Sequence, residues 1–311
     1  MSGFCHLPPY SVSFQPMGLS ECIDWGIAAY GIPPLWASTR GVGVTVAVLD
    51  TGIATHSALV GTVIDHRNFT TDPELQDTLG HGTHVAGIIA AHGPRSGIAP
   101  ACNLLSLKVL GHSGMGSNDA VATAVRYAVD AKVDLISMSL GSNYADDHVH
   151  QAICYASQAG IPVVCAAGND GGLVDFPAAF KETISVGAVD ETGVVCEFSS
   201  RGKEIVVAAP GHNITSTWLA DGYATISGTS MAAPFVSGVL ALYISQQKAQ
   251  GLPHNPTVVT QALISTCTDV GAVGRDDVYG WGLVNPHGMM GSSVAVRAGG
   301  ITIFIPGGKI L

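Results

Sequence analysis

Residues 44–50 read Val-Thr-Val-Ala-Val-Leu-Asp, a run of β-branched and apolar side chains that ends in an acid. Such a run predicts a strand that is buried on both faces and carries Asp50 at its carboxyl end. Further runs of this kind follow, and helical patterns lie between them. This alternation predicts an α/β fold, in which helices cover both faces of a mostly parallel central sheet. The other expected strands are residues 104–110, 133–140, 161–167, 183–189 and 205–209, and the expected helices are residues 81–91, 117–130, 146–159 and 230–248.

A serine stands between a glycine turn and an apolar run. Residues 228–234 read Gly-Thr-Ser-Met-Ala-Ala-Pro, and an apolar segment continues over residues 235–242. Ser230 is therefore expected at the start of a buried helix. Unpaired N–H groups and the positive dipole end of a helix N-terminus would stabilise an oxyanion formed there. Pro234 is expected in the first turn, where a proline loses no helical hydrogen bond.

Two further residues meet the requirements of a nucleophilic serine. A serine hydroxyl needs a neutral imidazole to take its proton, and the imidazole needs a carboxylate that holds its tautomer. His81 opens a helical segment, and Asp50 ends a buried strand. In open α/β sheets, reactive sites lie beyond the carboxyl ends of the strands. Asp50, residues 139–141 and Asn169 all follow predicted strands, so we expect them at that edge.

The composition favours one large domain that binds neither nucleic acid nor an anionic membrane. The 311 residues are 47% hydrophobic and 12% charged, and the formal net charge is -10. No Lys/Arg cluster occurs, which argues against phosphate-rich partners. Residues 1–20 lack a signal-peptide pattern, and no apolar stretch of about 18 residues occurs, so a cytoplasmic location is expected.

The cysteines and histidines predict no metal site. The seven cysteines are odd in number and scattered, and no Cys-x-x-Cys spacing occurs, so they are interpreted mostly as buried free thiols. His148 and His150 are interpreted as surface residues of a helix. His81 and His84 are an alternative metal pair, but no third ligand stands at a suitable spacing, so His84 is interpreted as structural.

Four sequence blocks, taken in order, carry a family resemblance. Residues 48–52, 81–87, 166–169 and 228–234 together resemble the subtilisin family of serine proteases, and residues 279–285 extend the match. The chain order Asp, His, Ser is a known property of subtilisin itself. The resemblance implies a three-layer subtilisin-like fold.

Three segments follow from this resemblance. Residues 24–290 form the expected catalytic domain, and residues 1–23 are an N-terminal extension. Residues 291–311 are a C-terminal β-type tail that packs on the domain or extends it. A Pro-Gly-Gly turn at residues 306–308 predicts a hairpin or an edge strand there.

The resemblance also implies a serine endopeptidase that hydrolyses peptide bonds through an acyl-enzyme and requires no cofactor for its chemistry. Ser230 is the implied nucleophile, His81 the general base and then acid, and Asp50 the orienting carboxylate. Asn169 is the implied side-chain donor to the oxyanion, beside the backbone N–H of Ser230. Thr229 is expected to contribute indirectly.

Two segments match the family strands that hold a substrate as an added strand between them. Main-chain pairing gives affinity with little demand on the substrate sequence, and glycines permit the close approach. The implied substrate-binding residues are Gly114, Met115, Gly116, Ser139, Leu140 and Gly141.

Asp175 falls near the base of the pocket for the residue that precedes the cleaved bond. The loop at residues 171–177 is shorter than usual in the family. A carboxylate there favours Lys or Arg in the substrate. The alternative is that Asp175 faces solvent.

The N-terminal extension resembles that of the intracellular subtilisins. Leu7, Pro8, Pro9 and Tyr10 stand where those proteins have a Leu-Ile-Pro-Tyr type segment that crosses and blocks the active site. A prodomain of the secreted kind does not fit before Trp25. The resemblance therefore implies a latent enzyme whose own N-terminal segment is a binding partner. The alternative is a tail that only packs on the surface.

Calcium is common in the family, but its principal site is expected to be lost. Ala58 stands where a ligand carboxylate is expected, and the loop at residues 91–97 is short. Hard cations need several oxygen ligands. A different structural calcium site, using Asp72, Glu74 or Asp77, stays open.

Other functions stay open beside the endopeptidase. One is a maturation protease dedicated to a single precursor, and another is a peptide transacylase, which needs a lid that excludes water. The alternative from a different class is an inactive module that holds a peptide in its cleft. The presence of Asp50, His81, Asn169 and Ser230 together argues against it.

Overall fold

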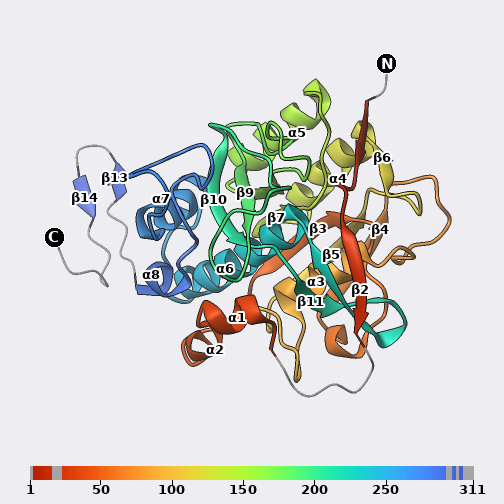
Figure 1. The fold of residues 1–311 in the computed structure, drawn as a ribbon, viewed down its shortest axis with the longest axis horizontal. Coiled ribbons are helices and arrows are strands. Elements are labelled where there is room, and N and C mark those ends of the chain that lie inside the picture. Colours follow the sequence, from red (N-terminus) through yellow and green to blue (C-terminus); the bar gives the residue numbers. More distant parts are fainter. Residues whose placement is uncertain (1–2, 16–22, 292–295, 299–300, 304–311) are drawn as a thin grey trace.

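A computed structural model of the chain describes residues 3–15, 23–291, 296–298 and 301–303. Its centre is a sheet of seven strands, ordered β10-β9-β8-β7-β3-β5-β4, in which every neighbouring pair is parallel (Figure 1). The predicted parallel sheet is therefore confirmed. Its strands are β3 (Thr45–Asp50), β4 (Val63–Asn68), β5 (Asn103–Lys108), β7 (Leu135–Met138), β8 (Val163–Ala166), β9 (Ile184–Val189) and β10 (Ile205–Pro210).

Helices cover both faces of the sheet: α3 (His81–Ala90), α4 (Asn118–Asp130), α5 (Asp147–Gln158) and α6 (Thr229–Ala249). Helices α3 and α6 share one core with Val46 and Val48 of β3, and α4 and α5 share the other with Ala47 and Leu49. Successive residues of a strand point to opposite faces, so two covered faces require a strand that is apolar throughout. The three-layer α/β fold is confirmed.

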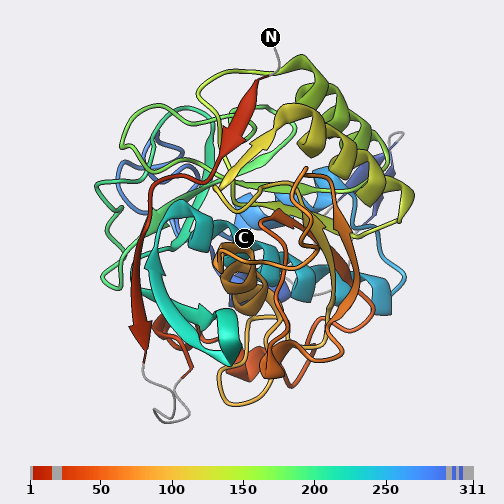
Figure 2. The same ribbon diagram turned by 90° about the vertical axis from the view of Figure 1, so that its right-hand side faces the viewer.

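The N-terminal segment forms two strands that pair with different parts of the molecule. β1 (Phe4–His6) runs antiparallel to β6 (Met115–Ser117), and β2 (Ser11–Gln15) runs antiparallel to β12 (Tyr223–Ser227). Figure 2 shows this segment in red, running down one side of the molecule past both partners. Residues 7–10 therefore bridge two separate β-sheets.

Several elements are absent from the sequence prediction. β4 lies at the edge of the sheet and has two apolar residues followed by four polar ones, so it lacks the continuous apolar run of the inner strands. No described helix is long and apolar enough to cross a membrane. The other elements are α1 (Trp25–Ala29), α2 (Ile32–Leu35), η1 (Ser57–Leu59), β11 (Ile214–Thr217), η2 (Leu219–Asp221), α7 (Pro256–Thr266) and α8 (Pro286–Gly291).

The described part of the C-terminal tail contains two short paired strands. β13 (Val296–Ala298) pairs antiparallel with β14 (Ile301–Ile303). The Pro-Gly-Gly at residues 306–308 lies outside the described residues.

Candidate active site

Asp50 and His81 meet at the carboxyl edge of the sheet. Asp50 is the last residue of β3, His81 is the first residue of α3, and both are fully buried. Nδ1 of His81 lies 2.8 Å from Oδ1 and 3.0 Å from Oδ2 of Asp50. The N–H of Thr51 donates to Asp50 Oδ1 at 2.7 Å and fixes the carboxylate. This arrangement places the imidazole proton on Nδ1 and leaves Nε2 as a base.

Gly82 allows this approach of α3 to β3. A Cβ at residue 82 would lie 2.1 Å from the carbonyl oxygen of Gly52 and 3.1 Å from Asp50. The contact with Gly52 excludes a side chain, because it is made by a backbone atom, and the contact with Asp50 would be tight. A glycine after His81 is therefore required by the packing.

Asp77 fixes the start of α3 from the preceding loop. Its Oδ1 accepts hydrogen bonds from the N–H groups of Leu79 and Gly80, and its Oδ2 accepts from the N–H and hydroxyl of Thr83. Its Oδ1 also accepts from the hydroxyl of Thr51. A carboxylate beside the N–H groups of a helix start stabilises the helix, and here it also orients His81.

Ser230 lies at the start of α6, as predicted. It is the second residue of the helix and is fully buried, so its N–H is among the first four, which have no acceptor within the helix. Gly228 precedes the helix, and a Cβ there would lie 2.9 Å from Nδ2 of Asn169. The absence of a side chain at residue 228 keeps the space between Asn169 and the helix start open.

The placement of Pro234 in the first turn is wrong. The helix begins at Thr229, so Pro234 lies in its second turn. A proline there cannot donate to the carbonyl of Ser230, four residues earlier. The hydroxyl of Ser139 donates to that carbonyl instead, at 2.9 Å. Pro234 thus frees a carbonyl through which the loop after β7 is tied to the serine.

Asn169 has a fixed orientation. Its Oδ1 accepts from the N–H of Thr229 at 2.8 Å and from the Thr229 hydroxyl at 2.7 Å. Because Oδ1 is occupied in this way, the donor Nδ2 must face the cleft. Thr229 is thus a positioning residue for the amide, a role that the sequence analysis anticipated only as indirect.

The Ser230 hydroxyl is not hydrogen-bonded to the His81 imidazole. Oγ of Ser230 donates to the carbonyl of Ser139 at 3.5 Å, and Nε2 of His81 is buried without a hydrogen-bond partner among the described residues. The ring of Tyr10 lies 5.1 Å from the His81 ring, centroid to centroid. Burial and the charges of Asp50 and Asp77 raise the pKa of Tyr10 to about 12, so the phenol is neutral.

The N-terminal segment lies in the cleft as an added strand. Cys5 pairs with Gly116 and His6 with Met115, and His6 also exchanges two backbone hydrogen bonds of 2.9 Å with Gly141. On the other side, the N–H of Leu7 donates to the carbonyl of Gly114 at 3.0 Å. The two predicted substrate segments therefore hold a strand between them, and that strand is part of this chain.

The carbonyl of Pro9 contacts the predicted oxyanion donor. Nδ2 of Asn169 donates to this carbonyl oxygen at 2.9 Å. Pro8 is buried, whereas Pro9 is exposed. Neither proline has an N–H, so this part of the segment forms fewer main-chain hydrogen bonds than an ordinary peptide would.

Asp175 is buried beside the cleft and does not face solvent. Its side chain lies between the loops after β7 and β8, because a Cβ at Gly141 or Gly168 would lie 2.9 Å or 2.5 Å from Oδ2. The next residue, Phe176, exchanges two backbone hydrogen bonds with Ser142. Burial, and to a smaller extent the charge of Asp170, raise the pKa of Asp175 to about 6, while His6 opposes the shift.

The remaining predicted polar residues are accounted for as follows. His84 is fully buried, its Nε2 donates to the carbonyls of Ile214 and Ala224, and burial lowers its pKa to about 3. It is therefore a neutral residue that joins α3 to β11 and β12.

Asp72 accepts from the N–H of His112 at 2.6 Å. A calcium site at Asp72, Glu74 or Asp77 stays a prediction, although the oxygens of Asp77 are already occupied by the bonds described above.

This fold and this site define a class of protein, the serine hydrolases of α/β type with the chain order Asp, His, Ser. Comparison with known proteins narrows the class. The Subtilase family of S8 peptidases matches residues 41–282. This chain therefore belongs to the subtilase family, and it is a subtilisin-like serine endopeptidase.

Bacterial relatives cover most of the chain. The intracellular serine protease of Paenibacillus polymyxa is 44% identical over 252 residues, which are 76% of this chain and 77% of that protein. The major intracellular serine protease of Bacillus subtilis is 42% identical over 265 residues, covering 80% and 83%. Subtilisin Savinase of Lederbergia lenta is 37% identical over 274 residues, covering 86% and 98%.

Sequence reasoning missed the residues that hold the site together. Asp77 had a readable signal, since an acid in the turn before a helix commonly caps it. Ser139 was predicted only as a substrate contact, and its bond to the carbonyl of Ser230 depends on the tertiary position of the loop after β7. A contact across 91 positions has no local signature.

Proposed function

We propose that Asp50, His81 and Ser230 are the catalytic triad of this endopeptidase and that residues 4–10 hold it latent. One observation carries both parts: a peptide strand already lies in the cleft, and its Pro9 carbonyl accepts a hydrogen bond from Asn169. A cleft that pairs with a strand on both edges and ends at an amide donor is suited to peptide substrates.

The chemistry follows from the positions of the side chains. When the cleft is open, Oγ of Ser230 turns from the Ser139 carbonyl to Nε2 of His81 and gives up its proton as it attacks the scissile carbonyl. The resulting oxyanion is held by Nδ2 of Asn169 and by the N–H of Ser230. His81 then protonates the leaving amine, and water hydrolyses the acyl-enzyme by the same steps in reverse. Asp50 stabilises the imidazolium throughout.

The latency is attributed to three contacts of the N-terminal segment. β1 occupies the position of a substrate strand, Pro9 occupies the oxyanion donor, and the Tyr10 ring covers His81. β2 anchors the far end by pairing with β12. A segment that is tethered at both ends has a high effective concentration in the cleft, so a free substrate competes poorly with it.

We further propose that Asp175 selects Lys or Arg before the cleaved bond. Its carboxylate is buried next to Gly141 and Gly168, at the loops that would flank that side chain. A buried carboxylate without a cation partner gains from a basic side chain. This interpretation rests on the cleft geometry and not on the comparisons.

We also propose that the enzyme acts in the cytoplasm. The two most similar relatives described above carry the word intracellular in their names, and a latent form would protect the proteins of the cell from cleavage.

The test of the proposed function compares the full chain with a form that lacks residues 1–20. Peptide cleavage should rise on deletion by about tenfold or more, because the segment occupies the cleft most of the time. A synthetic peptide of residues 3–15 should then inhibit the truncated enzyme, and the same peptide carrying Tyr10→Ala should inhibit it less. Ser230→Ala should abolish cleavage in both forms.

A point variant of the full chain tests the latency even if the truncated form fails to fold. Leu7→Asp in the full chain leaves β2 in place but puts a charge on a partly buried side chain that packs against the core. Its activity should also rise. Equal rates for all forms, together with no inhibition by the peptide, would remove the latency proposal and leave the triad intact.

A further inference from the structure

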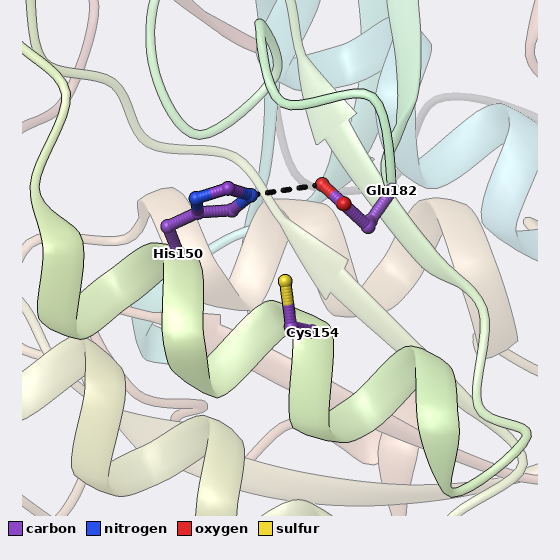
Figure 3. A group of neighbouring side chains, drawn as sticks. All are labelled: His150, Cys154 and Glu182. Carbon is purple, nitrogen blue, oxygen red and sulfur yellow. Dashed lines mark hydrogen bonds and ion pairs between the residues drawn. The ribbon is translucent and has the colours of Figure 1, made fainter.

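A cluster of three potential metal ligands lies on α5, away from the triad. His150 and Cys154 are one helical turn apart on α5, and Glu182 precedes β9. Figure 3 shows the three side chains pointing toward one another. Among the described residues, this is the one group of at least three His, Cys, Asp or Glu side chains with converging ligand atoms.

The spacing of the ligand atoms suits one metal ion. Nε2 of His150 lies 3.0 Å from Oε2 of Glu182, and the three ligand atoms all lie within 4.8 Å of one another. Metal–ligand bonds of ~2.0–2.3 Å in a tetrahedron place ligand atoms roughly 3.5 Å apart. The observed separations bracket this value, so rotations of the side chains close the site without movement of the backbone.

The ligands are held in place before any ion binds. The His150 ring stacks on Phe180 with centroids 4.2 Å apart and an interplanar angle of 8°. The Glu182 side chain is 16% exposed, and its other oxygen lies 3.8 Å from Nζ of Lys181. Since α5 fixes the spacing of His150 and Cys154, little conformational entropy is lost on binding.

We propose that His150, Cys154 and Glu182 bind a thiophilic divalent transition metal ion of the Zn²⁺ kind, with water as the fourth ligand. A thiolate, an imidazole and a carboxylate form a mixed donor set that Zn²⁺ accepts and that Ca²⁺ and Mg²⁺ do not prefer. The thiol proton of Cys154 leaves to solvent as the S–metal bond forms. Two anionic ligands neutralise the charge of the ion.

The site lies behind the substrate pocket. Phe180, on which His150 stacks, also packs against Phe176, with ring centroids 4.9 Å apart. Phe176 follows Asp175 directly. The ion would therefore bind on the outer side of the wall that carries Asp175, without touching Ser230, His81 or a bound peptide. Metal binding can thus be measured separately from cleavage.

The experiment uses the full chain carrying Ser230→Ala, reduced and stripped of metal by dialysis. Addition of Co²⁺ should give the thiolate-to-metal charge-transfer band and the intense visible bands of tetrahedral Co²⁺, saturating at one ion per chain. Addition of Zn²⁺ should bleach these bands. Cys154→Ser should abolish the charge-transfer band, and His150→Ala should weaken Co²⁺ binding at least tenfold.

Two control variants test whether the signal belongs to this site. Cys267→Ser removes another partly buried thiol, and His148→Ala removes a neighbouring exposed imidazole on α5. Both should keep the wild-type spectrum. Thermal unfolding without metal confirms that each variant is folded. The proposal is overturned if Cys154→Ser retains the band, if Cys267→Ser loses it, or if the folded parent protein gives no band with excess Co²⁺.

Discussion

The molecule contains two histidine–carboxylate pairs with nearly the same separation. His81 lies 2.8 Å from Asp50, and His150 lies 3.0 Å from Glu182. A third side chain is proposed to act with each pair: Ser230 with the first, and Cys154, whose sulfur lies within 4.8 Å of the other two ligand atoms, with the second. The two pairs differ in burial, since the His81 and Asp50 side chains are 0% and 1% exposed, whereas those of His150 and Glu182 are 39% and 16% exposed.

The ring nitrogen that each carboxylate contacts is the more informative difference. Asp50 binds Nδ1 of His81, which leaves Nε2 free on the opposite side of the ring. Glu182 instead binds Nε2 of His150, and the sulfur of Cys154 lies on that same side (Figure 3). The first arrangement leaves Nε2 open to accept a proton while the carboxylate holds the other ring nitrogen, whereas the second brings three potential ligand atoms around one point. The same residue types thus support acid–base catalysis or metal binding, depending on geometry.

The largest expected effect separates the two pairs by activity. In the form without residues 1–20, Ser230→Ala or His81→Ala should lower kcat by ~10⁶, a magnitude known from subtilisin itself. Cys154→Ser and His150→Ala should leave kcat/KM for peptide substrates within about twofold, because neither residue touches the cleft. Steady-state hydrolysis of a fluorogenic peptide measures all four. A comparable loss of activity in Cys154→Ser would show that the cluster at His150 also takes part in catalysis.

The next effect concerns the oxyanion donor, which the His150 pair lacks. Asn169→Ala should lower kcat by ~10²–10³ with little change in KM, again a magnitude taken from subtilisin. Thr229→Ala should lower kcat by a smaller factor, because it removes one of the two hydrogen bonds that orient the Asn169 amide and keeps the one from the backbone N–H. Thr229→Ser keeps the hydroxyl and should be close to wild type. If Thr229→Ala raised KM alone, the positioning role would be wrong.

A third, smaller effect concerns Asp175, a buried carboxylate with no histidine bonded to it. Its pKa is raised to about 6, so it is charged above that pH and becomes neutral as the pH falls through it. The preference for Arg over Phe before the cleaved bond should therefore be about tenfold or more at pH 8 and decline below pH 6. The ratio of kcat/KM for the two substrates measures it, because a pH effect that is common to both substrates cancels in that ratio.

Asp175→Asn is the matched control for this pH dependence. It keeps the size and polarity of the side chain but cannot ionise, so the Arg/Phe ratio should be low and constant with pH. A wild-type ratio that is equally flat would mean that Asp175 does not contact the substrate side chain.

Much of the fold, and the positions of Asp50, His81 and Ser230 within it, could be predicted from sequence because both depend on local patterns. The inner strands are apolar throughout, and Asp50, His81 and Ser230 each stand at the end or the start of an element. The error at Pro234 arose because a helix start is defined by its hydrogen bonds and not by the residue types around it. The serine, two residues into the helix, was placed correctly all the same.

The cluster at His150 was not predictable in the same way. His150 and Cys154 have the helical spacing that brings two side chains together, but Glu182 lies 32 positions from His150, in the loop before β9. A search for Cys-x-x-Cys spacing cannot detect a site with a single cysteine. The approach of α5 to the loop before β9 depends on the packed sheet, which only the three-dimensional structure provides.

The smallest expected effect compares the two pairs by stability. In the Ser230→Ala background with a chelator present, His150→Ala should lower the unfolding free energy by about 1 kcal/mol. It loses a ring stack on Phe180 and a partly exposed ion pair, each of which contributes little. His81→Ala should cost about 3 kcal/mol or more, because it leaves the carboxylate of Asp50 buried without its partner. Urea unfolding measures both, and equal losses would show that burial does not distinguish the two pairs.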